Sequence, residues 1–232
     1  MANLNLNKAY MLERAYYNYI DRISVHLREA SDFFVRRSLD AEVAETYKNQ
    51  LRKKGMDDET IEEKAKEVKK KELTELVGLD VAYDMGWQKC SSGRRYDSKS
   101  GHAFLIGLIT NKIIGVVVFC KDCRKCMEAE KKGVPPEPHA NCPRNYNNSS
   151  KAMESDGAVK LVLQIHNQYN KMVCINHFLG NNDSTTRSLL LKKTDKNNGK
   201  LPEDYPLDLT FWADVNHCVK CMQAFVCTCC IA

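Results

Sequence analysis

Residues 102–120 read HAFLIGLITNKIIGVVVFC, two apolar and β-branched segments separated only by Asn111 and Lys112. So short a connection between two apolar segments is typical of an antiparallel hairpin. Residues 77–84, VGLDVAYD, have the same apolar character and end in an acid. These three segments predict three successive strands that form an antiparallel meander.

The segments that follow predict a mixed α/β (α+β) fold. Residues 149–170, SSKAMESDGAVKLVLQIHNQYN, offer Ser149 or Ser150 as an N-cap and then carry apolar residues at helical spacing. Residues 171–186, KMVCINHFLGNNDSTT, indicate a buried strand, after which Ser184 or Thr185 can begin another helix. Residues 194–208 are polar and rich in Asn, Asp and Pro, which predicts a surface excursion. The closing residues 211–232 are apolar, without a periodicity that separates strand from helix.

The first 76 residues predict a helical N-terminal region. Apolar residues recur there at spacings of three and four, which indicates a helix with one buried face. After Gly55, acids precede bases along residues 57–77, which suits the dipole of a second helix. We therefore expect a helical region at residues 1–76, a core at residues 77–232, and a loop inserted into the core at residues 120–148. The apolar face of the first helix consists of Leu12, Tyr16, Tyr19, Ile20, Ile23 and Leu27.

The composition excludes several classes of protein. The chain has 232 residues, of which 43% are hydrophobic and 28% are charged, as in an ordinary globular protein. The longest apolar stretch, residues 113–119, is far shorter than the roughly 20 residues of a membrane-spanning helix. The first residues lack the basic and apolar regions of a secretory signal. We therefore expect no membrane span and a reducing intracellular compartment, in which the 11 cysteines are thiols or metal ligands rather than disulfides.

The net charge of +5 lies in the middle third of the chain, where residues 79–151 hold 12 basic and 7 acidic side chains. A locally basic stretch indicates a surface that meets phosphate, although five charges also fall within the ordinary variation of a soluble surface. Bases and aromatics alternate in the loop after Asp84, which either contacts DNA phosphates and bases or is a solvated loop with one core tryptophan. The candidate DNA-binding residues are Trp87, Lys89, Arg94, Arg95 and Lys99.

The strongest local motif is Cys123-x2-Cys126, followed after twelve residues by His139-x2-Cys142. Two close pairs separated by a loop can hold Zn²⁺ tetrahedrally, and such an ion stabilises a segment that has little core of its own. The spacing therefore predicts a structural zinc site. A second group near the C-terminus lacks another pair with suitable spacing; it consists of His217, Cys218, Cys221, Cys227, Cys229 and Cys230.

Two acids at predicted strand ends form another candidate site. Asp84 ends the first strand of the meander, and Asp183 follows the later strand. If that strand returns beside the first, the two carboxylates lie close together and suit a two-metal site that holds Mg²⁺ and cleaves a phosphodiester. An acid at a strand end is also often a turn or capping residue, so both interpretations stay open. Asp80 lies on the same strand face as Asp84, but deeper.

Several motifs, taken in order, resemble the Mutator-like transposase domain of eukaryotic DNA transposons. They are YDMGWQKCSSGRRYDSKSGHAFLIG (83–107), the Cys/His loop, NNSSKAME (147–154), GNNDSTT (180–186) and FWADVNHCVK (211–220). The resemblance extends from about residue 10 to residue 225. It implies an RNase H-like core, made of the meander, a helix and a returning parallel strand, with a carboxylate triad. It also implies Mg²⁺ or Mn²⁺ as cofactor, cleavage and rejoining of DNA at transposon terminal repeats and target sites, action in the nucleus, and self-association into a homo-oligomer.

Carried over residue by residue, the resemblance makes Asp84 and Asp183 the first two catalytic carboxylates. It makes Cys123, Cys126, His139 and Cys142 the cysteine-histidine insertion of the family. Asp214, together with His217, matches a further acid-to-histidine motif and is the remaining catalytic candidate.

The chain departs from the family pattern in ways that bear on activity. Cys90 stands where a base is commoner, and Asn181 and Asn182 stand where acids are commoner. The glutamate of the triad is expected on a helix beyond the last motif, so the core is expected to be truncated there. Glu154 precedes the second carboxylate and fits that topology poorly.

Three functions fit these observations. The first is a transposase catalytic domain that cleaves and transfers DNA strands with the help of metal ions. The second is a catalytically inactive, zinc-stabilised DNA-binding or interaction module derived from a transposase. The third is another RNase H-like nuclease that acts on an RNA or hybrid strand.

Overall fold

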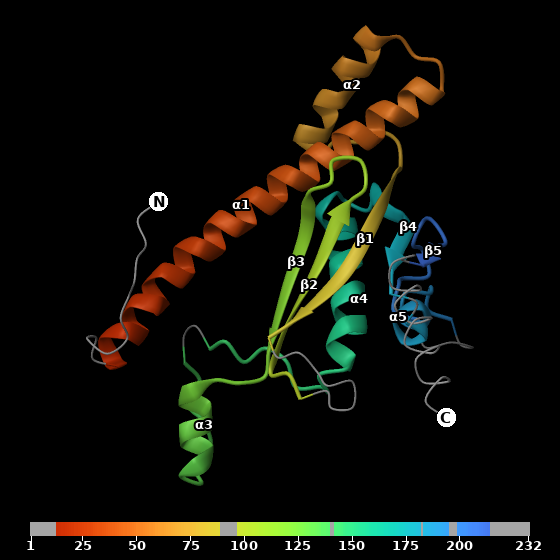
Figure 1. The fold of residues 1–232 in the computed structure, drawn as a ribbon. Coiled ribbons are helices and arrows are strands. Elements are labelled where there is room, and N and C mark those ends of the chain that lie inside the picture. The colour runs from red at the N-terminus through yellow and green to blue at the C-terminus, as the bar shows by residue number, and fades with distance from the viewer. Residues whose placement is uncertain (1–12, 89–96, 140–141, 182, 195–198, 214–232) are drawn as a thin grey trace, which may run out of the picture.

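Five strands form one mixed sheet in the order β3-β2-β1-β4-β5. The structure is a computed structural model, and it describes residues 13–88, 97–139, 142–181, 183–194 and 199–213. Its elements, shown in Figure 1, are α1 (Glu13–Lys53), α2 (Asp58–Lys70), β1 (Val77–Trp87), β2 (Ser100–Gly107), β3 (Ile113–Cys120), α3 (Arg124–Lys131), α4 (Ala152–Gln168), β4 (Val173–Gly180), α5 (Ser184–Leu189) and β5 (Thr210–Ala213).

The predicted meander is confirmed. β1 pairs antiparallel with β2, and β2 pairs antiparallel with β3. In the short connection between β2 and β3, Asn111 has a φ of 54°, a left-handed conformation that asparagine tolerates well. β4 then returns parallel to β1, and β5 lies parallel to β4 at the edge. The carboxyl ends of β1, β4 and β5 therefore meet at one edge of the sheet.

One face of the sheet is the protein core. Along β1 the alternate residues Val77, Leu79, Val81 and Tyr83 are buried, while the residues between them are more exposed. α4 packs on this buried face, and a Cβ added at Gly157 would lie only 2.7 Å from the Cβ of Ala103 in β2. Figure 1 shows α4 lying behind the strands. The close contact requires a residue without a side chain at position 157.

The second half of α1 crosses the same core. Glu42 is fully buried, and its carboxylate accepts hydrogen bonds from the backbone N–H groups of Ile109 and Thr110, at 3.0 and 2.8 Å. Gly107 lies against this carboxylate, where a Cβ would be 2.2 Å from it. One buried apolar cluster extends from Leu39 in α1 through the sheet and α4 to Tyr205.

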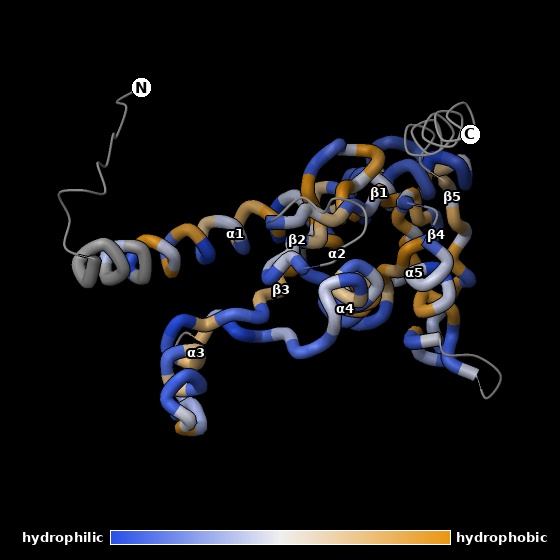
Figure 2. The backbone as a smooth tube through the Cα atoms, turned by 60° about the horizontal axis from the view of Figure 1, so that its bottom comes forward, coloured by the Kyte–Doolittle hydropathy of each residue, from blue (hydrophilic) through white to orange (hydrophobic). Residues whose placement is uncertain are grey.

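The apolar face predicted for the first helix is not buried where the structure describes it. Tyr19 and Leu27 are 43% and 65% exposed, and Phe33 and Phe34 are also exposed. The reason is that α1 extends well beyond the sheet (Figure 1), and hydrophobic turns continue along this extension (Figure 2). Periodicity predicted a helix with an apolar stripe, but it could not say what the stripe contacts.

The segment predicted as a surface excursion at residues 194–208 exposes most of the polar residues of its described second half, but it also contributes two side chains to the core. Leu201 and Tyr205 are each 1% exposed. The Tyr205 hydroxyl accepts a hydrogen bond from the backbone N–H of Ile175 in β4, at 2.8 Å. The sequence analysis missed these two core side chains because most residues around them are polar. None of the helices in the described ranges combines the length and apolar character needed to cross a bilayer.

Candidate functional site

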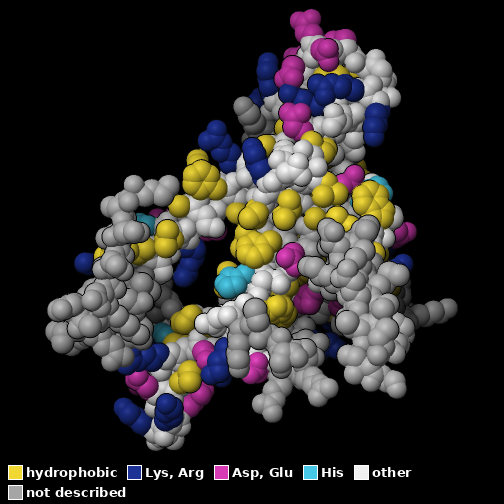
Figure 3. Space-filling model, viewed as in Figure 1, with side chains coloured by type: hydrophobic (Ala, Val, Ile, Leu, Met, Phe, Trp, Pro, Cys, Tyr) yellow, Lys and Arg dark blue, Asp and Glu magenta, His cyan; other side chains and the backbone are white. Residues whose placement is uncertain are grey.

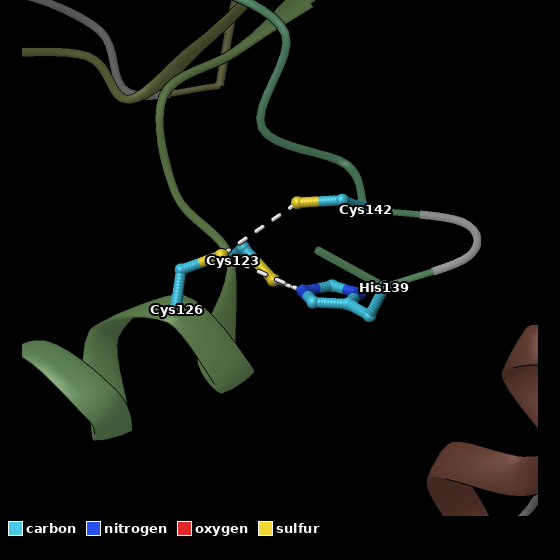
Figure 4. A group of neighbouring side chains, drawn as sticks. All are labelled: Cys123, Cys126, His139 and Cys142. Carbon is cyan, nitrogen blue, oxygen red and sulfur yellow. Dashed lines mark hydrogen bonds between the residues drawn. The ribbon is translucent and has the colours of Figure 1, made fainter. Parts of the chain in front are cut away.

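The predicted cysteine-histidine group comes together at the start of α3. Cys123 is the N-cap residue of α3 and Cys126 lies in its first turn, so a spacing of three brings both thiols to one side. His139 and Cys142 lie on the segment that returns past this helix end (Figure 4). The four ligand atoms all lie within 4.8 Å of one another. The sequence prediction of these four residues as one cluster is confirmed.

The spacing within this group fits zinc. His139 Nε2 lies 3.4 Å from Cys123 Sγ and 3.5 Å from Cys126 Sγ, and Cys126 Sγ lies 3.7 Å from Cys142 Sγ. Around a tetrahedral zinc with ordinary bond lengths, a sulfur and a nitrogen lie about 3.6 Å apart and two sulfurs about 3.8 Å apart. Because the distances agree, this Cys₃His group can hold a zinc ion.

Two thiols of the group, those of Cys123 and Cys126, differ in pKa. Burial raises the pKa of Cys123, but hydrogen bonds from the backbone N–H and the thiol of Cys126 and from Cys142 outweigh burial and lower this pKa to about 7. Burial and the neighbouring sulfurs raise the pKa of Cys126 to about 11. The first thiol therefore ionises easily and the next does so with difficulty, since like charges repel. A divalent cation removes this repulsion.

The returning part of the inserted segment is attached to the core. The Asn145 side chain accepts a hydrogen bond from the Cys120 backbone N–H and donates one to the Val118 carbonyl, both at 2.8 Å. The Tyr146 ring packs against the Phe119 ring, with centroids 4.6 Å apart. These contacts fasten the returning segment to β3. The tip, by contrast, is mostly hydrophilic (Figure 2), so the Cys₃His group is its centre of packing.

Asp84 and Asp183 lie at the same edge of the sheet. β1 and β4 pair in parallel through Ala82 and Leu179, so Asp84 lies two residues beyond this pair and Asp183 four residues beyond it. Asp84 is exposed, and its Oδ1 accepts a hydrogen bond from the Met85 backbone N–H at 2.8 Å. The predicted parallel return beside β1 is therefore present, but Asp84 lies within β1, which continues to Trp87, rather than at the end of the strand.

Asp183 also caps a helix. Its Oδ2 accepts hydrogen bonds from the backbone N–H and the hydroxyl of Thr186, each at 2.8 Å, and α5 begins at the next residue. The predicted helix start at Ser184 is therefore confirmed, and Asp183 is the residue that caps it. Both hydrogen bonds use the same carboxylate oxygen, and this interaction orients the side chain at the sheet edge.

Glu154 is a third acid at this edge. Its Oε1 accepts a hydrogen bond from the Asn181 side chain at 3.3 Å, and its backbone carbonyl accepts one from the Tyr83 hydroxyl. Burial, followed by the charges of Glu154 and Asp84, raises the pKa of Tyr83, so this hydroxyl keeps its proton and donates. Sequence reasoning placed Glu154 poorly because it followed chain order. β1 runs toward the acidic edge, β2 runs away from it, and β3 runs toward it again. α4 follows β3 in the chain, so it begins near the same edge.

The acids do not form a compact metal cluster. Among the residues that the structure describes, the Cys₃His group is the only set of three or more His, Cys, Asp or Glu residues whose ligand atoms lie within 4.8 Å of one another. The acidic edge therefore offers carboxylates of the kind that Mg²⁺ prefers, but not a converged triad.

Comparison with known families decides the relationship of this chain to other proteins. A family model described as Mutator-like transposase matches residues 36–228. The chain belongs to the Mutator-like transposase family. Searches of curated proteins and of solved structures find no match. In this family member the match includes the whole sheet, the Cys₃His group and all three edge acids, and it begins within α1, shortly before the helix enters the core.

Two of the proposed DNA-binding residues of this Mutator-like chain have structural contacts. Trp87 packs over Gly101, where a Cβ would lie 3.3 Å from its ring. Lys99 forms an ion pair with Asp122 at 2.6 Å. The other predicted site residues lie outside the described residues; they are Lys89, Arg94, Arg95, Asp214 and His217, together with the C-terminal cysteines.

Sequence reasoning missed one further arrangement in this family member. Asp80 Oδ1 lies 2.6 Å from His177 Nδ1, and the imidazole stacks on Trp212 with ring centroids 4.1 Å apart. These residues come from β1, β4 and β5, on the face of β1 that also carries Asp84. Only the parallel pairing of the three strands brings them together.

Proposed function

We propose that this chain is the catalytic core of a transposase, which cleaves DNA strands at transposon ends and transfers them to target DNA in the nucleus. The observation that carries this proposal is the presence of Asp84, Glu154 and Asp183 at one edge of a sheet ordered β3-β2-β1-β4-β5. A meander followed by a helix and a returning parallel strand is the arrangement expected of an RNase H-like core. Membership of the Mutator-like family supports the same activity.

The chain contributes oriented negative charge to this reaction. A backbone N–H holds the carboxylate of Asp84, another holds that of Asp183, and the Asn181 amide holds that of Glu154. Oriented side chains do not have to be reorganised when a ligand binds. Bound Mg²⁺ or Mn²⁺ would activate water and stabilise the leaving oxygen of a phosphodiester. We propose Glu154 as a third acid at this edge; Asp214, the other candidate, lies outside the described residues.

DNA would approach along the loop that follows β1, because this loop begins at the edge of the sheet that carries the three acids. The basic middle third of the chain supports this path, with Lys89, Arg94 and Arg95 as phosphate contacts. Lys99 contributes less because Asp122 already neutralises its charge.

Amide variants test the proposal without removing the local hydrogen bonds. We expect Asp84→Asn, Asp183→Asn and Glu154→Gln each to lower the rate of nicking of supercoiled plasmid DNA in Mg²⁺ or Mn²⁺ by at least about 100-fold. Each amide oxygen can still accept the hydrogen bond of the carboxylate that it replaces. Asp208→Asn is the control, because the Asp208 side chain is 90% exposed and pairs only with Lys192 among the described groups. Unchanged nicking in the Asp84 and Asp183 variants would rule the proposal out.

A second candidate is a catalytically inactive, zinc-stabilised DNA-binding or interaction module. It is favoured by the contrast between a Cys₃His group that fits zinc and edge acids that do not converge among the described residues. This function predicts DNA binding that weakens with salt and no nicking in either metal. Competition between DNA, RNA and hybrid substrates would separate the transposase from an RNase H-like nuclease with another substrate.

A further inference from the structure

Arg187 lies on the short helix that Asp183 caps. This helix, α5, lies beside β4 and β5 (Figure 1). Arg187 follows the capping residue by four positions, which is about one helical turn, so the two residues lie on the same side of the helix. Both line one pocket of about 200 Å³, together with Asn181 and Phe211. The pocket therefore places an arginine beside one of the edge acids.

A row of aromatic rings holds the Arg187 guanidinium. Its central carbon lies 5.3 Å from the centroid of the Phe211 ring, an arrangement that is attractive for a cation. The Phe211 and Phe178 rings have centroids 6.0 Å apart, and those of Phe178 and Tyr83 are 5.4 Å apart. Phe178 and Tyr83 are buried in the core. The guanidinium is therefore supported by rings that are anchored in the core, although Arg187 itself is exposed.

The charge of Arg187 is not neutralised by an acid among the described residues. Its contact with the Phe211 ring is its one recorded side-chain interaction in that part of the chain. Lys99, by contrast, forms an ion pair with Asp122 at 2.6 Å. A guanidinium presents its N–H donors in a rigid plane that matches the oxygens of a phosphate. Arg187 is therefore free to bind an anion at the acidic edge.

A phosphate of DNA needs such a cation at this edge. Asp84, Glu154 and Asp183 are negatively charged and repel a phosphate. In the view of Figure 3, Lys and Arg side chains gather over α1, α2 and α3, and few are visible over the strands. The pocket is also smaller than the roughly 300–1,000 Å³ of a pocket that encloses a drug-sized molecule, so it suits a group of the size of one phosphate.

We propose that Arg187 is a DNA-binding residue, whose guanidinium donates two parallel hydrogen bonds to one phosphate of the DNA strand beside the cleavage site. This inference rests on the proposed transposase function, because it assigns a substrate contact to the same edge. Two parallel hydrogen bonds orient a phosphate as well as attract it. The contact therefore holds the strand in one orientation beside Asp183.

The salt dependence of DNA binding tests this contact. The probe is a fluorescein-labelled DNA duplex, and its binding to the full chain is measured by fluorescence anisotropy at several KCl concentrations. The logarithm of the association constant falls with the logarithm of the salt concentration, by about 0.9 for each phosphate contact. We expect Arg187→Gln to reduce this slope by about 0.9 and to raise the Kd at least about fivefold at low salt.

Two further variants separate a phosphate contact from a structural role. Arg187→Lys keeps the positive charge, so it should keep the native slope, with weaker binding because a lysine cannot donate two parallel hydrogen bonds. Arg52→Gln is the matched control for loss of an exposed arginine. Arg52 lies in the last turn of α1, near Lys54, which pairs with Glu75 just before β1 begins. It is therefore at the opposite end of the sheet, and its loss should change the Kd less than about twofold.

Four results would overturn the proposal. They are a native chain that does not bind the duplex, an unchanged slope in Arg187→Gln, an equal loss of slope in Arg52→Gln, and a loss of slope in Arg187→Lys as large as in Arg187→Gln. A loss of slope with an RNA probe of the same sequence, but not with DNA, would assign the contact to an RNA strand and would also contradict it. Circular dichroism of each variant checks that the fold is kept.

The test separates this contact from the activity. Anisotropy measures binding without cleavage, so a native chain that binds DNA through Arg187 but does not nick plasmid contradicts the transposase activity alone. A chain that nicks plasmid through Asp84 and Asp183, with an unchanged slope in Arg187→Gln, contradicts the Arg187 contact alone.

Discussion

The metal cluster and the acidic edge are assembled in opposite ways. The four residues of the Cys₃His group lie between positions 123 and 142 and meet through one helix turn and one returning loop. Asp84, Glu154 and Asp183 come from β1, α4 and the cap of α5, and they meet only because the sheet and α4 are in place. The first site depends on spacing along the chain, whereas the second depends on the whole core. Changes at one site should therefore leave the other intact.

The largest effect is expected from removing a ligand of the metal cluster. Cys142→Ser should lower the apparent zinc affinity by at least about 100-fold, because a hydroxyl is a poor substitute for a thiolate. Competition with a chromophoric chelator measures this affinity. Cys120→Ser is the matched control, since the Cys120 thiol lies outside the cluster and donates to the Asp122 carbonyl. Equal losses in the two variants would show that the cluster is not the zinc site.

Acidification should weaken the same site strongly. Thiols must lose their protons to bind zinc, so proton competition grows as pH falls below each thiol pKa. Cys126, with a pKa of about 11, must lose its proton to bind zinc, so zinc affinity should fall at least about tenfold for each pH unit below 11, and more steeply below pH 7, where Cys123 also binds a proton. Chelator competition across this range measures the slope. An affinity independent of pH would contradict thiolate coordination.

A change in the core should destabilise the fold without weakening zinc binding at the Cys₃His group. Gly157→Ala would ordinarily stabilise a helix, but here the new Cβ would meet Ala103 Cβ at 2.7 Å and the Tyr83 hydroxyl at 3.0 Å. We expect the free energy of unfolding in urea to fall by about 1–3 kcal/mol, with zinc affinity unchanged. Adding Ala103→Gly should recover part of this loss, because it removes the clashing atom. A stabilised Gly157→Ala variant would show that α4 does not pack this closely.

The smallest effect separates the two roles of Asp183. Asp183→Ala should lower the free energy of unfolding by about 1 kcal/mol through loss of the cap on α5. Asp183→Asn should remain within a few tenths of a kcal/mol of the native protein, because asparagine also caps helices. Urea unfolding compares the two variants directly. If both lose plasmid nicking while only the alanine variant loses stability, the charge and the cap are distinct contributions.

Much of the fold was predictable from residue patterns. Apolar β-branched segments joined by Asn111 and Lys112 predicted the meander, and β1 to β3 confirm it. The Cys₃His group was predictable because its geometry is local. The family resemblance rested on the order of several motifs, and the family match confirms it.

Other features could not be predicted because their partners are distant in the chain. Periodicity predicted an apolar stripe on the first half of α1 and assigned this stripe to the core. The first half of α1, however, extends beyond the sheet. Leu201 and Tyr205 lie in a polar segment, and only their contacts with Leu191 and Ile175 bring them into the core. Glu154 lies at the acidic edge because it is in the first turn of α4, and α4 begins at that edge.

The sequence by itself determined the meander, the helix and strand that follow it, the Cys₃His group and the family, because each depends on side chains within about 20 residues or on the order of motifs. It did not predict α3 (Arg124–Lys131), which lies in the segment predicted as a loop, or β5. The tertiary structure decided which acids share an edge, which half of α1 is buried and which polar segment contributes to the core. The physical reason is that parallel pairing of β1 with β4, and docking of α1 and α4 on one sheet face, join residues far apart in the chain, and no local pattern encodes those contacts.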